Sequence, residues 1–172
     1  YNGYTGEKMT VVLAKALLYT HFNKKAEELA LEDYKPGDKL IPFKVVGEYK
    51  GPDLVGMEYE QLIPWVKPVT VDENGKWQEA AGQAFRVILG DYVTTDDGTG
   101  IVHIAPTFGA DDAFVARAAG IPSLFMINKK GETRPMVDLT GKFYLLDELD
   151  EAFVKECVDV EKYKEYQGRW VK

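Results

Sequence analysis

Two runs of β-type apolar residues place the strongest constraint on the fold of this chain. They span residues 85–94 (FRVILGDYVT) and 100–105 (GIVHIA), and an Asp-Asp-Gly-Thr turn separates them. Because apolar residues follow one another instead of alternating with polar ones, we expect strands that are buried on both faces. These runs therefore predict the buried strands of the fold.

Shorter patterns predict the other elements. An Asn-Gly pair between β-type runs indicates a hairpin at residues 69–77, within an exposed excursion over 66–84. A strand over 39–49 is interrupted by Pro42, which indicates an edge or a bulge. The remaining patterns predict a strand at 8–13 as the second half of a hairpin, a strand at 124–127, a turn at 129–132, and helices at 14–22, 24–31, 109–119, 147–158 and 160–167.

Composition limits the classes of protein that this chain can belong to. The 172 residues carry 21 Lys and Arg against 28 Asp and Glu, a net charge of −7, and they suffice for a single domain. No apolar run approaches the roughly 18 residues of a membrane span, so we expect no membrane partner. The acidic balance argues against a module that grips a nucleic-acid backbone alone. The single cysteine, Cys157, cannot form an internal disulfide, which favours a cytoplasmic location.

Chemically useful side chains are concentrated in residues 94–112. His103 lies near the end of a predicted strand, and Asp111 and Asp112 begin the next predicted helix. Neighbours on a helix differ by about 100° in direction, so only one of the two aspartates can point inward. The other should cap the helix or meet solvent. The helix dipole keeps a carboxylate anionic there, which suits it to holding a ligand ammonium group and not to donating a proton.

Each of these features also has a purely structural interpretation. A lone histidine on a buried strand is more often a core residue, and paired aspartates in a first helical turn are usually caps. The Gly-Thr-Gly at residues 98–100 is too short for a phosphate-binding fingerprint and is first of all a turn. Cys157 has the pattern of a core residue, and His21 that of a surface residue without acidic or nucleophilic neighbours.

Four blocks, taken together in this order, identify a family. They are LVGMEYEQL at 54–62, DYV at 91–93, GTGIVHIAP at 98–106 and FGADD at 108–112. In this combination the chain resembles, over nearly its whole length, the editing domain inserted in isoleucyl-tRNA synthetase. The valyl and leucyl enzymes share the Gly-Thr-Gly and a later Asp, whereas a histidine after Gly-Ile-Val, here His103, is the isoleucyl pattern.

The resemblance implies a fold and a reaction. The fold is mixed α/β, with a β-barrel-like core and peripheral helices as in class I synthetase editing domains, and 1–172 is one editing-domain fragment that lacks its first strand or strands. The reaction is hydrolysis of the ester in mischarged Val-tRNA(Ile). A second, hydrolytic site is needed because one methylene changes the binding free energy in the synthetic pocket by only about 1 to 3 kcal/mol, too little to reject valine. Isoleucyl-tRNA synthetase is the standard illustration of this limit.

The resemblance also implies roles for particular residues. Asp112 matches the aspartate that binds the substrate α-ammonium, and His103 matches the histidine that walls the side-chain pocket and rejects isoleucine. Asp111 matches a non-catalytic position. A positioned water attacks the ester without a covalent protein nucleophile, and a free hydroxyl of the terminal ribose assists. The residues implied to line the site are Gly98, Thr99, Gly100, Ile104, Ala105, Pro106 and Phe108.

Partners and cofactors follow from the same resemblance. We expect this domain to receive the 3′ end of tRNA(Ile) carrying a mischarged amino acid, and to contact the rest of the synthetase chain. We expect no cofactor or metal in it, since ATP and Mg²⁺ belong to the synthetic domain of the full enzyme. A threonine-rich peptide of the family's editing pocket lies before Tyr1, so we expect the isolated chain to fold but to hydrolyse its substrate weakly.

Three alternatives stay open at this point. The first is a metal-dependent hydrolase that uses His103, Asp111 and Asp112, although two adjacent aspartates and a histidine are a poor ligand set. The second is a docking insert without catalysis, which contacts another domain through the aromatic stretch of Tyr163, Tyr166, Arg169 and Trp170. The third is an editing domain of valyl or leucyl specificity.

Overall fold

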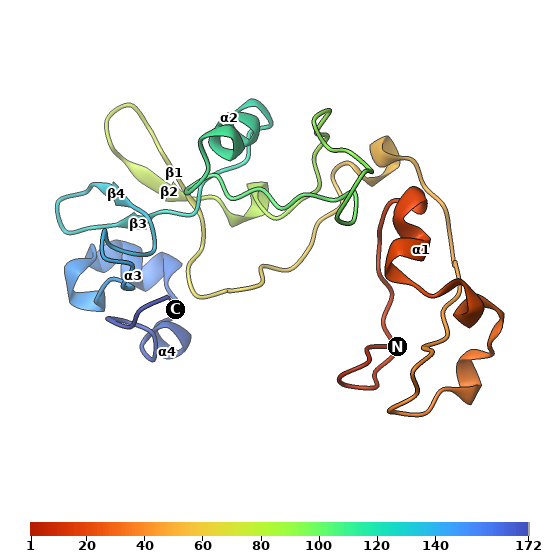
Figure 1. Ribbon diagram of the computed structural model, residues 1–172. Coiled ribbons are helices and arrows are strands. Elements are labelled where there is room, and N and C mark those ends of the chain that lie inside the picture. Colours follow the sequence, from red (N-terminus) through yellow and green to blue (C-terminus); the bar gives the residue numbers. More distant parts are fainter. Residues whose placement is uncertain (172) are drawn as a thin grey trace. The chain divides into compact units, whose positions relative to one another are not determined.

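The computed structural model describes residues 1–171 and has a mixed α/β fold, with its helices and strands labelled in Figure 1. The chain forms two compact units, which are described separately below. Unit 1 comprises Tyr1–Asp53 and Leu89–His103, and unit 2 comprises Leu54–Ile88 and the chain from Ile104 onward.

The elements are short. The α-helices are α1 (Leu18–His21), α2 (Ala110–Ala118), α3 (Glu151–Cys157) and α4 (Val160–Tyr163). The strands are β1 (Val69–Val71), β2 (Trp77–Glu79), β3 (Met126–Ile127) and β4 (Thr133–Arg134). Single 3-10 turns span Lys15–Leu17, Lys24–Glu28, Leu31–Asp33, Gly51–Leu54, Ala81–Gln83 and Leu146–Glu148.

Unit 2 has a hydrophobic core built from the two hairpins and the C-terminal helices. Phe153 of α3 is fully buried, and the ring of Trp77 from β2 meets it edge to face. The hydroxyl of buried Tyr163 donates to the carbonyl of Tyr144, so its polar end is satisfied. Cys157 is buried in this core, as its pattern predicted. The buried members are Val66, Val69, Met126, Ile127, Leu149, Phe153, Cys157 and Tyr163.

The Asn-Gly pair forms the predicted hairpin. Strands β1 and β2 are antiparallel, with Val69 opposite Glu79 and Val71 opposite Trp77. The carboxylate of Asp72 accepts from the backbone N–H groups of Asn74 and Lys76 and so closes the turn. The base of this excursion is not exposed, since Val69 is only 2% exposed and belongs to the core.

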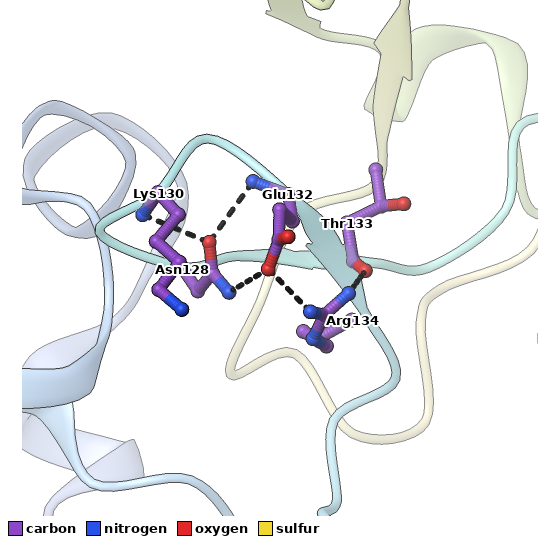
Figure 2. Close-up of polar contacts among 5 residues, drawn as sticks. All are labelled: Asn128, Lys130, Glu132, Thr133 and Arg134. Atoms are coloured by element: carbon purple, nitrogen blue, oxygen red, sulfur yellow. Dashed lines mark hydrogen bonds and ion pairs between the residues drawn. The ribbon is translucent and has the colours of Figure 1, made fainter.

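Strands β3 and β4 form a second antiparallel hairpin, joined by a turn around the predicted residues 129–132. Figure 2 shows the side chains that organise it. The amide oxygen of Asn128 accepts from the backbone N–H groups of Lys130 and Glu132. The Asn128 amide nitrogen and the Arg134 guanidinium both contact the Glu132 carboxylate. The Asn128 hydrogen bond, and then the Arg134 charge, lower the pKa of Glu132.

Helix α2 is the predicted helix at 109–119, and its C-terminus explains why glycine follows it. Gly120 has a φ of +67°, in the left-handed region that glycine adopts without a steric penalty. Its N–H bonds to the carbonyl of Arg117, and the N–H of Ile121 bonds to the carbonyl of Ala116. This pair of bonds satisfies the last carbonyls of the helix.

Unit 1 has a small core of its own. Leu17 is buried beside α1, and the ring of Phe22 packs against that of the buried Phe43, with 4.8 Å between their centroids. Tyr1 stacks on Tyr34 at 4.4 Å. The predicted helix at 14–22 is present, although it begins as a 3-10 turn and continues as α1.

The main β-strand predictions were wrong. Residues 85–94 and 100–105 form no strand. Within the described chain, the first run pairs with a second backbone only over residues 85–87, where hydrogen bonds to residues 56–59 flank the bridge between Glu58 and Arg86. They are not buried on both faces either, because Leu89 is 61%, Ile101 52% and Val102 51% exposed. A run of apolar residues favours an extended backbone, but a ladder also needs a second backbone alongside it.

Two smaller strand predictions fail for the same reason. Residues 8–13 and 39–49 carry no ladder, although Pro42 is fully buried. The paired strands of residues 1–171 form two two-stranded sheets, and these do not close a barrel.

Each of the remaining predicted helices contains helical turns, although over shorter ranges than predicted. The stretch at 24–31 is made of 3-10 turns and not of α-helix. The pattern at 147–158 contains a 3-10 turn and then α3, which Asp150 caps by accepting from the N–H of Phe153. The pattern at 160–167 is helical only over α4, and the strand at 124–127 is reduced to β3.

Candidate functional site

Asp112 lies in the first turn of α2 and faces the loop that precedes this helix. Its Oδ2 accepts a hydrogen bond from the backbone N–H of Ala105, with 3.0 Å between the two atoms. A Cβ at Gly109 would lie 2.7 Å from the same oxygen, so the absence of a side chain at Gly109 lets the carboxylate approach. The side chain is half-buried and ties the loop to the helix N-terminus.

The two aspartates of α2 differ as the helical periodicity predicts. Asp112 is half-buried against the loop, whereas its neighbour Asp111 is exposed to solvent. Both lie at the N-terminal end of a nine-residue helix, whose dipole favours a negative charge. Of the two aspartates, Asp112 is the one whose carboxylate contacts this loop.

The loop between Ile104 and Phe108 is a tight turn within unit 2. The carbonyl of Ala105 accepts from the N–H groups of Phe108 and Gly109, at 3.0 and 3.1 Å. The hydroxyl of Thr107 donates to the carbonyl of Leu124 and anchors the loop next to β3. Ile104, Ala105 and Pro106 are half-buried, whereas the ring of Phe108 is 68% exposed.

The Gly-Thr-Gly turn belongs to unit 1 and packs on the helical segment at 15–21. The carbonyl of Thr99 accepts from the N–H of Ala14 at 2.7 Å, and the carbonyl of Gly98 lies 2.5 Å from Nε2 of His21. Both glycines have a positive φ, +61° at Gly98 and +72° at Gly100. The interpretation of these residues as a turn is confirmed.

His103 closes the second segment of unit 1, three residues after Gly100. Its side chain is exposed, and none of the hydrogen bonds found within residues 1–171 involves its ring. The structure thus brings Asp112 together with Ala105 and Gly109 in unit 2. His103 and the Gly-Thr-Gly turn before it belong to unit 1.

Sequence reasoning missed the partners of the Gly-Thr-Gly turn. His21 is exposed, as predicted, but it also contacts the carbonyl of Gly98, which lies 77 residues away in the chain. A contact to a backbone carbonyl leaves no trace in the sequence of the partner. The sequence also gives no sign that Ala14 contacts the turn, because Ala14 contributes only a backbone N–H and a methyl group.

The aromatic stretch near the C-terminus is largely used in packing. Tyr163 is buried, and Tyr166 stacks on Trp65 with 3.9 Å between the ring centroids. Trp170 is 57% exposed, and Lys142 Nζ lies 4.8 Å from its ring centroid. Tyr163 is therefore not free to contact another domain, whereas Tyr166 is half-buried, with one ring face packed on Trp65.

Within residues 1–171, no three His, Cys, Asp or Glu side chains are grouped so that they could hold a metal ion. No helix in the same range has the length and apolar character needed to cross a membrane.

The chain is similar to isoleucine–tRNA ligases of several bacteria. Over all 172 residues the chain is 83% identical to an isoleucine–tRNA ligase of Bacteroides thetaiotaomicron. It is 73% identical over the same length to that of Bacteroides fragilis, and 51% identical over 173 aligned positions to that of Porphyromonas gingivalis. Its homologues are isoleucyl-tRNA synthetases. The chain spans only 14 to 15% of the length of these synthetases. No family model matches it.

Proposed function

We propose that this chain is the editing segment of an isoleucyl-tRNA synthetase, which hydrolyses valine from mischarged Val-tRNA(Ile). The observation that carries the proposal is the 83% identity, over the whole chain, to an isoleucine–tRNA ligase. The resemblance of the four blocks, which include the Gly-Thr-Gly turn, His103 and Asp112, supports the assignment of the segment to the editing domain. The names of the relatives favour isoleucyl over valyl or leucyl specificity.

Asp112 is proposed to hold the α-ammonium group of the valyl ester. The dipole of α2 favours a negative charge at this position, and the N–H of Ala105 bonds to Oδ2 only. The Oδ1 atom has no hydrogen bond within residues 1–171 and is left for the ligand. An ammonium group anchored there fixes the position of the adjacent ester carbonyl.

His103 is proposed to limit the size of the amino acid that can enter. Its imidazole is exposed and makes no hydrogen bond within residues 1–171, which leaves it able to line a pocket for the ligand side chain. One methylene separates isoleucine from valine, so steric exclusion at the pocket wall discriminates better than attraction does. A water molecule then attacks the ester carbonyl, and the tRNA 3′ hydroxyl leaves.

The test compares Asp112→Asn and Asp111→Asn in the intact synthetase. The asparagine keeps an oxygen for the N–H of Ala105 but loses the negative charge. We expect kcat/KM for Val-tRNA(Ile) hydrolysis to fall about 10- to 150-fold in Asp112→Asn, the value of a hydrogen bond to a charged group. The exposed Asp111→Asn is the matched control and should change the rate less than about twofold. Equal rates for the two variants would refute the role of Asp112.

A docking insert without catalysis is the second candidate. It is favoured by the bond between Asp112 and Ala105, because a carboxylate that ties a loop to a helix needs no ligand. On this reading the asparagine variant retains the structural bond and behaves like wild type, whereas Asp112→Ala lowers stability. The hydrolysis rate of Asp112→Asn separates the candidates, because a loss of stability in Asp112→Ala is expected for both. Thermal unfolding of the asparagine variant checks that its fold is kept.

We also propose that residues 85–94 and 100–105 complete a barrel-like core in the intact synthetase. The exposed apolar side chains of Leu89, Ile101 and Val102 support this, since they leave apolar surface to be covered. Slow amide hydrogen exchange over both runs in the intact enzyme is expected. Exchange at the rate of an unfolded chain would contradict the proposal.

The partners follow from the proposed reaction. They are the 3′ end of tRNA(Ile) and the rest of the synthetase, in the cytoplasm, and ATP and Mg²⁺ act in the synthetic domain only. Retention of hydrolysis by the intact enzyme without ATP or Mg²⁺ tests this assignment. Strict dependence on Mg²⁺ at the hydrolytic step would instead favour the metal-dependent alternative.

A further inference from the structure

The Gly-Thr-Gly turn is held by both ends of one helical segment. Ala14 precedes the 3-10 turn Lys15–Leu17, and His21 is the last residue of α1. The N–H of Ala14 bonds to the carbonyl of Thr99, and the ring of His21 reaches the carbonyl of Gly98. All of these residues belong to unit 1, so the contact is internal to one compact body.

The chemistry of the contact fixes the direction of the hydrogen bond. A carbonyl oxygen can only accept, so Nε2 of His21 donates to Gly98, with 2.5 Å between the two atoms. The donor role of Nε2 is thus assigned from its partner, which has no hydrogen to give. A glutamine side chain can place an N–H donor at a similar distance from the backbone, whereas a leucine has none.

A third contact shows that the turn is closely seated on this segment. A Cβ at Gly100 would lie 2.5 Å from the Cβ of Ala14, closer than two carbon atoms can approach without a shift. The hydroxyl of Thr99 further links the turn to Ile101, whose carbonyl it contacts at 3.2 Å. The backbone of the turn thus has little freedom to move away from residues 14–21.

We propose that His21 is a positioning residue for editing. By holding the carbonyl of Gly98, it fixes the turn from which Ile101, Val102 and His103 follow, and so it sets where the imidazole of His103 is presented. This inference rests on the proposed function, in which His103 separates valine from isoleucine. His21 itself touches no reacting atom and acts only through the turn.

The test measures discrimination by the intact synthetase. Hydrolysis of Val-tRNA(Ile) and of Ile-tRNA(Ile) is followed for wild type, His21→Leu, His21→Gln and Thr20→Ala. Thr20 is the matched control, because it is exposed on the same helix and its hydroxyl makes no hydrogen bond within the described part of the chain. The readout is the ratio of the two kcat/KM values, which a general loss of folded enzyme leaves unchanged.

We expect the ratio to fall about two- to tenfold in His21→Leu, the change that one neutral hydrogen bond gives. It should return to near the wild-type value in His21→Gln and stay unchanged in Thr20→Ala. An unchanged ratio in His21→Leu, or an equal fall in the leucine and glutamine variants, overturns the positioning role while leaving the proposed function intact. A wild-type enzyme that hydrolyses neither ester overturns both.

Discussion

Replacing Gly100 by alanine directly tests how closely the Gly-Thr-Gly turn packs against Ala14. Two costs combine at this position. The φ of +72° lies in the left-handed region, where an alanine costs about 1 to 2 kcal/mol. The new Cβ would also lie 2.5 Å from the Cβ of Ala14, and relieving such overpacking costs about 1 to 3 kcal/mol. We therefore expect Gly100→Ala to lower the free energy of local opening of unit 1 by about 2 to 5 kcal/mol.

Gly98→Ala is the matched control. Gly98 has a similar φ of +61°, but a Cβ there would meet no atom within 4 Å. This variant therefore bears only the backbone cost of about 1 to 2 kcal/mol. The difference between the two variants isolates the steric contact with Ala14. Adding Ala14→Gly should recover that difference in Gly100→Ala and none of it in Gly98→Ala.

The assay is amide hydrogen exchange at Ala14, whose N–H donates to the carbonyl of Thr99. Every 1.4 kcal/mol of lost local stability accelerates exchange about tenfold when closing is fast. We expect Gly100→Ala to exchange at least several times faster than Gly98→Ala. Equal exchange rates in the two variants would refute the close contact between the turn and residue 14.

Three further predictions concern unit 2. Phe153→Ala should lower the free energy of unfolding in urea by about 3 to 5 kcal/mol because Phe153 is fully buried, whereas Phe114→Ala, at a ring that is 73% exposed, should cost less than about 0.5 kcal/mol. The carboxyl of Glu132 should titrate below 4.5 by NMR, and in Asn128→Ala its pKa should rise; its contribution to stability is present above about pH 4.5 and is lost as the pH falls. Burial raises the pKa of the Cys157 thiol to about 11, so iodoacetamide should label it slowly in the folded protein and rapidly in urea; the neutral thiol stabilises the fold below pH 9, and this contribution is lost as the pH rises toward 11. Rapid labelling of the native chain would contradict this burial.

Local signals in the sequence predicted local structure well. Helix α2 was placed within one residue at each end, because Gly120 terminates it and its acidic first turn marks its start. The hairpin between β1 and β2 was found because Asn-Gly dictates a turn of defined geometry. The different environments of Asp111 and Asp112 followed from the helical period alone.

Features that depend on distant parts of the chain were not predictable in the same way. The runs at 85–94 and 100–105 have strand-like composition, but composition does not say which backbone pairs with them. The contact of His21 with Gly98 joins a side chain to a backbone carbonyl 77 residues away. Any residue at position 98 has such a carbonyl, so the sequence does not indicate the contact. The helical period predicted that only one of the two aspartates points inward, but the bond of Asp112 to Ala105 depends on how the loop before α2 folds back.

We propose that an isoleucyl-tRNA synthetase uses this segment to remove valine from tRNA(Ile) while sparing isoleucine. The most direct test is the pair of hydrolysis rates for Val-tRNA(Ile) and Ile-tRNA(Ile), measured with the wild-type synthetase and with His103→Ala. We predict rapid hydrolysis of the valyl ester only by the wild type, and increased hydrolysis of the isoleucyl ester in the variant. Rates at the spontaneous level for both esters with the wild-type enzyme would contradict the account.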